Sequence, residues 1–259
     1  MEEAVHTTSR VDIRPWPHDP TVAHLVLLDV GMVPTVSDVD TWIDRAVEAA
    51  PNDHSIRTIR TGALFPAAAE AFVQRDFVPI DRLILLERRL DPTESMPQVP
   101  RLASSPWQRG SGSTGTAPSQ RAFRLRRMRA RDLDTAADID IDAFETGWQN
   151  DAASLDEIRR ATPTAHARVL LNGREPIGFA LTGKAGSTGY LQRFAVRSAW
   201  QGRGAGRVLV GDALRWLSRR GATNALVNTG IDNDRALRLY ESLGFTRRHE
   251  HLVVLERRR

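Results

Sequence analysis

The stretch Gln201-Gly202-Arg203-Gly204-Ala205-Gly206 decides the fold of this chain. It follows a strand-like run, residues 190–196, and precedes a helix-like run, residues 208–217. Three glycines in six residues allow a tight turn in which backbone N–H groups face a ligand. A helix N-terminus behind such a turn attracts phosphate through its N–H groups and its dipole. The stretch is not a P-loop, because no Lys-Ser or Lys-Thr ends it, and it lacks the spacing of the dinucleotide fingerprint.

A second pattern lies downstream, in residues 233–245, and predicts a short capped helix. Asp232 or Asn233 is the expected N-cap, and Gly244 is the expected helix stop. Apolar residues recur at helical spacing between these ends. They are Ala236, Leu239, Tyr240 and Leu243.

The spacings Gln-x-x-Gly-x-Gly and Asn-x-x-Ala-x-x-x-Tyr-x-x-x-Gly-Phe resemble two signatures of the GCN5-related N-acetyltransferases (the GNAT family), which hold acetyl-CoA. The resemblance implies the GNAT acyl-CoA N-acyltransferase fold, an α/β fold with a mixed sheet. It also implies that a strand splays from its neighbour at Phe194, Ala195 and Val196, whose backbone then holds the pantetheine arm. The loop would take the pyrophosphate. The implied loop residues are Gln201, Gly202, Arg203, Gly204, Ala205 and Gly206.

The resemblance assigns further roles to single side chains. Tyr240 is the implied general acid toward the leaving thiolate, and its alternative role is that of an aromatic on the apolar stripe. Asn233 caps the helix, contacts the cofactor arm, or does both. Arg203 and Arg207 either contact phosphate or are solvated.

The general base is open at this stage. The C-terminal part is also similar to the protein N-terminal alanine acetyltransferases, in Ala143-Phe144-x-x-x-Trp148 and in residues 239–245. That branch carries a Glu where this chain has Asn228, whose amide cannot accept a proton. Glu145 is a candidate base, acting directly or through water, and alternatively an exposed carboxylate at a helix end. His166 is expected to be structural, and deprotonation by solvent is a further alternative.

Composition divides the chain into three parts. Residues 93–120 are rich in Pro, Gly and Ser and lack apolar periodicity, which predicts a linker between residues 1–92 and residues 121–259. The last part carries a complete order of GNAT elements. It includes a first helix with Leu133, Ala137, Ile141 and Phe144 on its apolar face, and a final hairpin of residues 245–249 and 252–255.

Residues 1–92 are interpreted as a shortened, degenerate copy of the last part. At an offset of 168, Arg60-Thr61-Gly62 faces Asn228-Thr229-Gly230, and Phe72 faces Tyr240. Leu-Glu-Arg-Arg ends both patterns after a slip of one residue. Phe65 replaces the Asn and Asp76 replaces the helix-stop Gly, and residues 31–35 lack the glycine loop. This copy is therefore expected to pack without binding acetyl-CoA.

Composition bounds the function. The chain has no Cys, which excludes a disulfide framework, a Cys-ligated metal site and a thiol nucleophile. The 36 basic residues exceed the 32 acidic ones only slightly and are spread along the chain, so no nucleic-acid partner is expected. Without a signal or membrane segment in view, a cytoplasmic protein is expected, and its oligomeric state is open.

These observations favour an acetyl-CoA-dependent N-acetyltransferase without a metal. The amine acceptor would be a protein N-terminus or a small molecule. The alternative is a non-catalytic module that binds acetyl-CoA or a protein partner.

Overall fold

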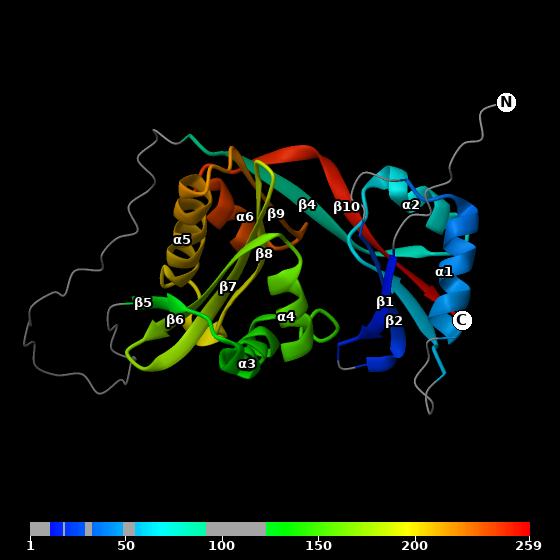
Figure 1. Cartoon of the computed structure of the whole chain (residues 1–259), viewed down its shortest axis with the longest axis horizontal. Coiled ribbons are helices and arrows are strands. Elements are labelled where there is room, and N and C mark those ends of the chain that lie inside the picture. The colour runs from blue at the N-terminus through cyan, green and yellow to red at the C-terminus, as the bar shows by residue number, and fades with distance from the viewer. Residues whose placement is uncertain (1–10, 18, 29–32, 49–54, 92–122) are drawn as a thin grey trace, which may run out of the picture. The chain divides into compact units, whose positions relative to one another are not determined.

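The computed structural model describes residues 11–17, 19–28, 33–48, 55–91 and 123–259 (Figure 1). The predicted linker, residues 93–120, lies outside the described residues. No helix in the described part of the chain is long and apolar enough to cross a membrane.

The chain forms two compact units that are not contiguous in sequence. Unit 1 comprises residues 1–86, 228–237 and 247–259, and unit 2 comprises residues 87–227 and 238–246. The predicted division into residues 1–92 and 121–259 differs from these units, because the C-terminal strand belongs mainly to unit 1. Strands β4, β9 and β10 and helix α6 each contribute residues to both units.

The structure has a mixed α/β order of elements. The first six elements are β1 (Val11–Trp16), β2 (Asp19–Leu27), α1 (Val36–Glu48), β3 (Thr58–Thr61), α2 (Pro66–Val73) and β4 (Val78–Arg89). The next six are β5 (Phe123–Arg127), η1 (Ala130–Asp132), α3 (Leu133–Ala143), α4 (Ala152–Arg160), β6 (Thr164–Asn172) and β7 (Glu175–Ala185). The last six are β8 (Thr188–Val196), η2 (Ser198–Trp200), α5 (Ala205–Arg219), β9 (Asn224–Gly230), α6 (Asp234–Glu241) and β10 (Thr246–Arg258).

The sheet of unit 2 is antiparallel through β5, β6, β7 and β8 and continues with a parallel pairing of β8 and β9. Alternate residues of its strands point to opposite faces. Leu155 on α4 packs with Val169 and Leu171 on one face, where α3 and α4 lie. On the other face, Leu170 packs with Val208 on α5 (Figure 1). Helices therefore cover both faces of this sheet.

Unit 1 pairs β1 with β2 antiparallel, β2 with β3 parallel, and β3 with β10 antiparallel. Helices α1 and α2 supply its core, which contains the fully buried Trp42 and Phe72. Strand β4 lies between β10 and β9 in the hydrogen-bonded order.

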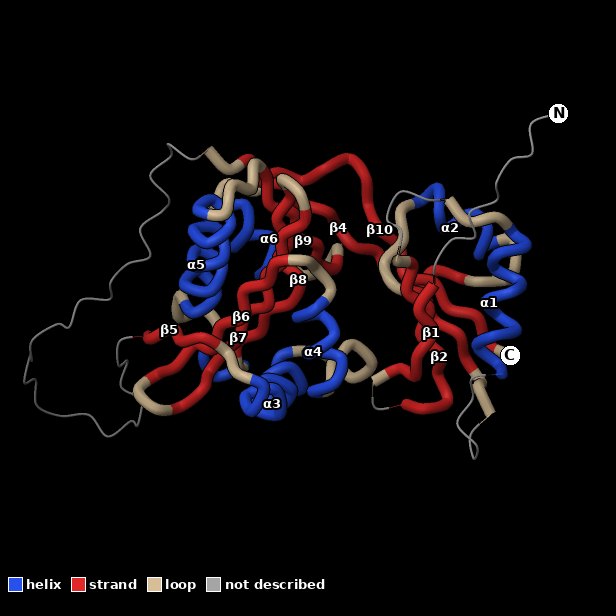
Figure 2. The backbone as a smooth tube through the Cα atoms, viewed as in Figure 1, coloured by secondary structure: helices blue, strands red, loops and turns tan. Residues whose placement is uncertain are grey.

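Two expectations from the sequence are wrong. The final hairpin is instead one continuous strand, β10 (Figure 2). The two residues between the predicted arms are Glu250 and His251, and they offer no Gly, Asn or Pro for a tight turn. On α3, Ile141 is 43% exposed, whereas the buried face carries Ala136, Ile139 and Asp140.

The bounds of the elements support the internal repeat. At the same offset of 168 residues, α2 (Pro66–Val73) coincides with α6 (Asp234–Glu241) residue for residue. The start of β4 coincides with the start of β10. The bounds of β3 fall within two residues of those of β9, and the bounds of α1 fall within three residues of those of α5. The first copy has no counterpart of β5, α3, α4 and β6 among the described residues.

Candidate functional site

The glycine loop joins the end of β8 to α5. Gly202 has a φ of 74° and Gly204 a φ of 84°, a region that L-residues with a Cβ rarely adopt. Gly204 is the N-cap of α5, so Ala205 and Gly206 are already the first turn of the helix. A Cβ at Gly202 or Gly204 would meet nothing within 4 Å. The backbone conformation therefore requires the glycines, and the space beside them is open.

The first turn of α5 presents backbone donors to this open space. The first N–H groups of a helix lack intrahelical acceptors and carry the positive end of the dipole. Ala205 is buried against the sheet, which fixes the helix end. The side-chain amide of Gln201 donates to the carbonyl of Val196 at 2.9 Å, so the loop is tied to the last residue of β8. The arrangement has the free backbone donors and the open space that an anion site needs.

Strands β8 and β9 separate beside the loop. Their parallel pairing runs from Thr188↔Asn224 to Tyr190↔Leu226, although β8 continues to Val196. In the described residues, the backbone of β8 from residue 191 to residue 196 therefore has no partner in β9, as the sequence predicted for Phe194 to Val196. Next to this opening, a β-bulge leaves Gln192 outside the register of β7 and β8.

Tyr240 lies against the open part of β8. Its ring packs edge to face on Phe194, with the centroids 5.9 Å apart, and it also contacts Phe245. The side chain is 3% exposed, and burial raises the pKa of Tyr240 well above its ordinary value. The phenol is thus held in its protonated form next to the splayed strand.

Helix α6 is fixed to the glycine loop and to β4. A Cβ on Gly206 would come within 3.0 Å of the Leu239 side chain, so glycine permits the close approach of α5 and α6. Arg207 donates to the hydroxyl of Ser242 at 2.7 Å. At the C-terminus of α6, the buried Arg88 of β4 donates to the carbonyl of Leu243. A cation there satisfies a helix-end carbonyl and favours the dipole.

The remaining predicted residues have different surroundings. Asn233 caps α6, because its side-chain oxygen accepts from the N–H of Ala236 at 3.1 Å. Arg203 lies over the ring of Trp200, with 5.3 Å between Cζ and the ring centroid. Glu145 is exposed in the turn after α3, where its carbonyl accepts from the N–H of Trp148. His166 stacks on Trp216 and hydrogen-bonds Asp212 at 2.8 Å, as expected of a structural residue.

A buried ion pair that the sequence did not reveal holds the turn after α3. Asp140 is 0% exposed, and its two oxygens accept from Arg193 Nε and a terminal guanidinium nitrogen, both at 2.7 Å. The same nitrogen of Arg193 donates to the carbonyl of Trp148 at 2.8 Å, and the guanidinium lies 3.5 Å from the centroid of Phe144. Asp140 also accepts from the N–H of Asn150. The pair therefore connects the central strand β8 to residues 144–150.

The corresponding strands of the first copy, β2 and β3, stay hydrogen-bonded to each other where β8 and β9 separate. Pairing of β2 with β3 runs from Val22↔Thr58 to Leu25↔Thr61. At the offset of 168, Val22↔Thr58 corresponds to Tyr190↔Leu226, the last pair between β8 and β9. The first copy thus continues its backbone pairing where the second copy opens.

Other features of the first copy also differ from an anion or acyl site. Its helix α1 begins at a Thr35–Asp38 box: the N–H of Asp38 donates to the Thr35 hydroxyl, and the Asp38 carboxylate accepts from Thr35. At the position matching Gln192, His24 packs on Trp16, with ring centroids 4.6 Å apart. Burial, helped by the charges of Arg14 and Arg60, lowers the pKa of His24 to about 3.

The sequence and the structure were compared with known proteins. The sequence model of the family described as "Acetyltransferase (GNAT) family" matches residues 133–245. A comparison with curated proteins gives no match.

Several solved structures share the fold. A GCN5-related N-acetyltransferase from Sphaerobacter thermophilus superposes with a TM-score of 0.58 at 16% identity, covering 97% of this chain and 76% of that one. A GCN5-related N-acetyltransferase from Kribbella flavida gives 0.55 at 16% identity, covering 96% and 89%. A tandem GNAT protein from the clavulanic acid biosynthesis pathway gives 0.63 at 12% identity, covering 99% and 81%. These likenesses confirm the predicted fold class.

Proposed function

We propose that the chain is an acetyl-CoA-dependent N-acetyltransferase acting on a primary amine. The match of residues 133–245 to the sequence model of the acetyltransferase (GNAT) family supports this proposal. One observation carries the proposal. The glycine loop and the open part of β8 lie together with the desolvated hydroxyl of Tyr240 in unit 2.

The described residues fit acetyl-CoA. The loop stands before the first turn of α5, with glycines at positive φ and open space beside Gly202 and Gly204, and this suits a pyrophosphate. The unpaired backbone of Phe194, Ala195 and Val196 suits the amides of the pantetheine arm, as a third strand would. Gln201 acts by holding the loop to β8, and Arg203 adds a cation beside it. Asn233 is assigned to the helix cap and, through it, to the position of α6.

The chemistry requires an activated acyl group, a neutral amine and a proton for the leaving sulfur. Acetyl-CoA supplies the thioester when bound. Tyr240 is the proposed proton donor to the leaving sulfur, because its ring lies on Phe194 of the open part of β8 and its phenol is protonated. Since the chain has no Cys, we propose direct attack of the amine rather than transfer through a protein thiol.

The acceptor is assigned to the side of β8 that carries the turn after α3. The residues of the motif shared with protein N-terminal alanine acetyltransferases, Phe144 and Trp148, contact Arg193 of the central strand. This contact supports a protein N-terminus as acceptor, with a small amine as the alternative. Glu145 in the same turn is the proposed base, through water, because its side chain is exposed.

We further propose that one chain holds one acetyl-CoA. The continued pairing of β2 with β3 leaves no gap for an acyl arm, and Asp38 places a carboxylate where a phosphate would meet α1. A like charge at a helix N-terminus disfavours a second anion there.

Calorimetry with acetyl-CoA tests the site. Gly204→Glu adds a side chain and a charge beside the pyrophosphate, and we expect affinity to fall roughly a hundredfold or more. Gly186→Glu is the matched control, because Gly186 also has a positive φ, 55°, and open space around it. Equal affinity of both variants and the parent would refute the assignment of the loop.

Release of CoA thiol over a panel of peptides and amines tests catalysis. Release that depends on an amine supports the enzyme. The alternative is a non-catalytic acetyl-CoA-binding or partner-binding module, which Asn228 in place of a Glu favours. Tight binding of acetyl-CoA without thiol release for any acceptor would support that alternative.

A further inference from the structure

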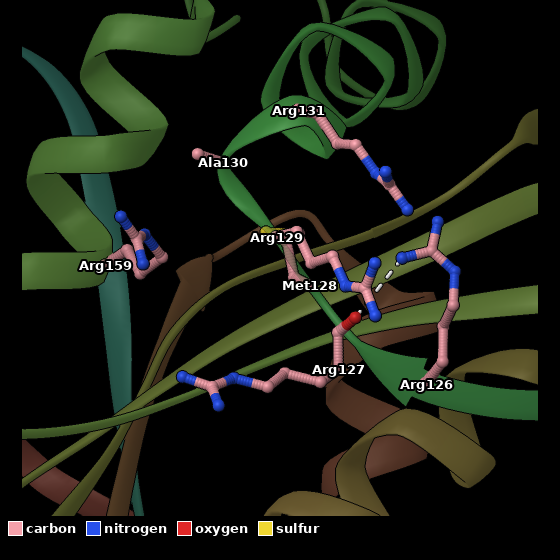
Figure 3. A pocket seen from close by; sticks show the side chains of 7 residues that line it. All are labelled: Arg126, Arg127, Met128, Arg129, Ala130, Arg131 and Arg159. Atoms are coloured by element: carbon pink, nitrogen blue, oxygen red, sulfur yellow. Dashed lines mark hydrogen bonds between the residues drawn. The ribbon is translucent and has the colours of Figure 1, made fainter.

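A second pocket in unit 2 is lined mainly by arginine. It lies where β5 passes into η1, beside the end of α4, and has a volume of about 520 Å³ (Figure 3). Its lining residues are Arg126, Arg127, Met128, Arg129, Ala130, Arg131 and Arg159. Figure 3 shows the guanidinium groups of Arg126, Arg129 and Arg131 turned toward one another.

Local structure explains why these side chains gather. Met128 is buried and anchors the end of β5, so the arginines on either side of it stay at the surface. Asp132 then fixes the turn: it accepts from the N–H of Arg129 at 2.7 Å and from two guanidinium nitrogens of Arg126 at 2.6 and 2.8 Å. The hydrogen bonds from Arg126 lower the pKa of Asp132, so this carboxylate stays charged.

The carboxylates near the pocket are fewer than its cations. Asp132 pairs with Arg126, and Asp156 is shared between Arg159 and its neighbour Arg160. The other three lining arginines are exposed, and in the described residues none has a carboxylate within ion-pair distance. They are Arg127, Arg129 and Arg131. Cations held close together repel unless an anion lies between them.

The pocket is separate from the acetyl-CoA site. Strand β5 pairs Phe123 with Asn172 at one end and Arg127 with Arg168 at the other. Phe123 also contacts Trp200, just before the glycine loop. The loop therefore lies near the first residue of β5, and the arginine pocket follows its last residue.

We propose that this pocket binds a compact polyanion of the polyphosphate class, independently of acetyl-CoA. Nearly all basic residues of this chain are arginine, so the residue type by itself is no argument. The argument rests on three guanidinium groups without carboxylates around one concavity. Planar guanidinium forks match phosphate oxygens, and three such cations suit a ligand with several charges. A pocket of about 520 Å³ is of the size that encloses a small molecule.

Calorimetry of the full chain with inorganic tripolyphosphate tests the proposal. Saturating acetyl-CoA is present, so that the glycine loop is already occupied. We expect one site per chain, and each Arg→Gln replacement at Arg127, Arg129 or Arg131 should weaken binding by roughly tenfold. The triple pocket variant, which combines these three replacements, should weaken binding further. Its matched control is the triple variant Arg124→Gln, Arg174→Gln, Arg219→Gln, which removes the same charge from exposed positions outside the pocket.

Several outcomes would overturn the proposal. These are absence of tripolyphosphate binding at low salt, equal weakening in the pocket and control variants, and equally tight binding of citrate. Tighter binding of a short oligouridylate that also depends on the control arginines would indicate a nucleic-acid surface instead. The single variant Arg129→Gln serves if the triple pocket variant does not fold. Because Gly204→Glu should leave tripolyphosphate binding intact, failure of this proposal is distinguishable from failure of the acetyl-CoA site.

Discussion

The buried pair of Asp140 and Arg193 gives the sharpest test of what holds unit 2 together. Asp140 is 0% exposed and the side chain of Arg193 is 18% exposed, so neither charge is well solvated. Removing one partner leaves the other charge buried without a counterion, at a cost of about 3–5 kcal/mol. Asp140→Leu and Arg193→Met should each lower the free energy of unfolding by this amount.

The double variant should be more stable than the sum of the two single effects allows. With both charges gone, the lost interactions are those to the N–H of Asn150 and the carbonyl of Trp148. Each lost hydrogen bond costs about 1 kcal/mol. The double variant should therefore lose about 2 kcal/mol, and since the two single losses sum to at least about 6 kcal/mol, the coupling energy should be about 4 kcal/mol or more.

Urea unfolding of the parent, the two single variants and the double variant measures this coupling. Arg75 and Asp40 in unit 1 are the control pair: the distances are 2.5 and 2.8 Å, but the side chains are 37% and 47% exposed. Water screens such a pair, so its coupling should be near zero. Additive effects for Asp140 and Arg193, or equal coupling energies in both pairs, would show that burial does not determine the strength of these ion pairs.

Further predictions concern the site and the two copies. Tyr240→Phe should lower kcat by roughly a hundred- to ten-thousandfold at unchanged acetyl-CoA affinity, and a change within about twofold would leave Tyr240 a core aromatic. The pKa of His24 is about 3 in the folded protein and 6.5 ordinarily. The contribution of neutral His24 to the free energy of unfolding is therefore present above pH 6.5 and is lost as the pH falls toward 3. At about pH 5 the free energy of unfolding should be lower by about 2 kcal/mol for this reason, so His24→Gln should flatten its pH dependence. The control, His249→Gln at an exposed position, should leave that pH dependence unchanged. Calorimetry should count one acetyl-CoA per chain, and two would contradict the closure of the first copy. Arg88→Met should reduce kcat at unchanged acetyl-CoA affinity, because α6 loses the cation at its C-terminus. An unchanged kcat would show that the contact of Arg88 with α6 does not position Tyr240.

The sequence predicted those parts of the site that depend on local backbone geometry. Gly202 and Gly204 occupy positive φ in the structure, and Gly244, with a φ of 80°, ends α6 as expected. The internal repeat could also be predicted from the sequence, and the matching bounds of α2 and α6 support it. Asp76 has a φ of 62° at the position that matches Gly244, so the same left-handed turn forms there without a glycine.

The features that the sequence missed are non-local. Nothing in the local sequence marks Arg193 as the ion-pair partner of a buried carboxylate, because Asp140 is far away in the chain. Periodicity also placed Ile141 in the core of α3, whereas Asp140 takes the buried position in order to meet Arg193. The pairing of β3 with β10, and of β4 with both β10 and β9, depends on which of several similar strands meet. Hydrophobic alternation sets the face of a strand but does not choose its neighbour.

Strand β4, the last strand of the first copy, contributes residues to unit 2 as well as to unit 1. Residues 87–89, the end of the first copy's strand β4, belong to unit 2. There the Glu87 carboxylate accepts from the side-chain amide of Asn224 at 2.9 Å, and its carbonyl accepts from Thr246. Arg88 caps the helix that carries Tyr240. Residues 121–259 alone would lack these partners and would leave β9 with an open edge. The last strand of the first copy is therefore needed by unit 2, whatever the first copy itself binds.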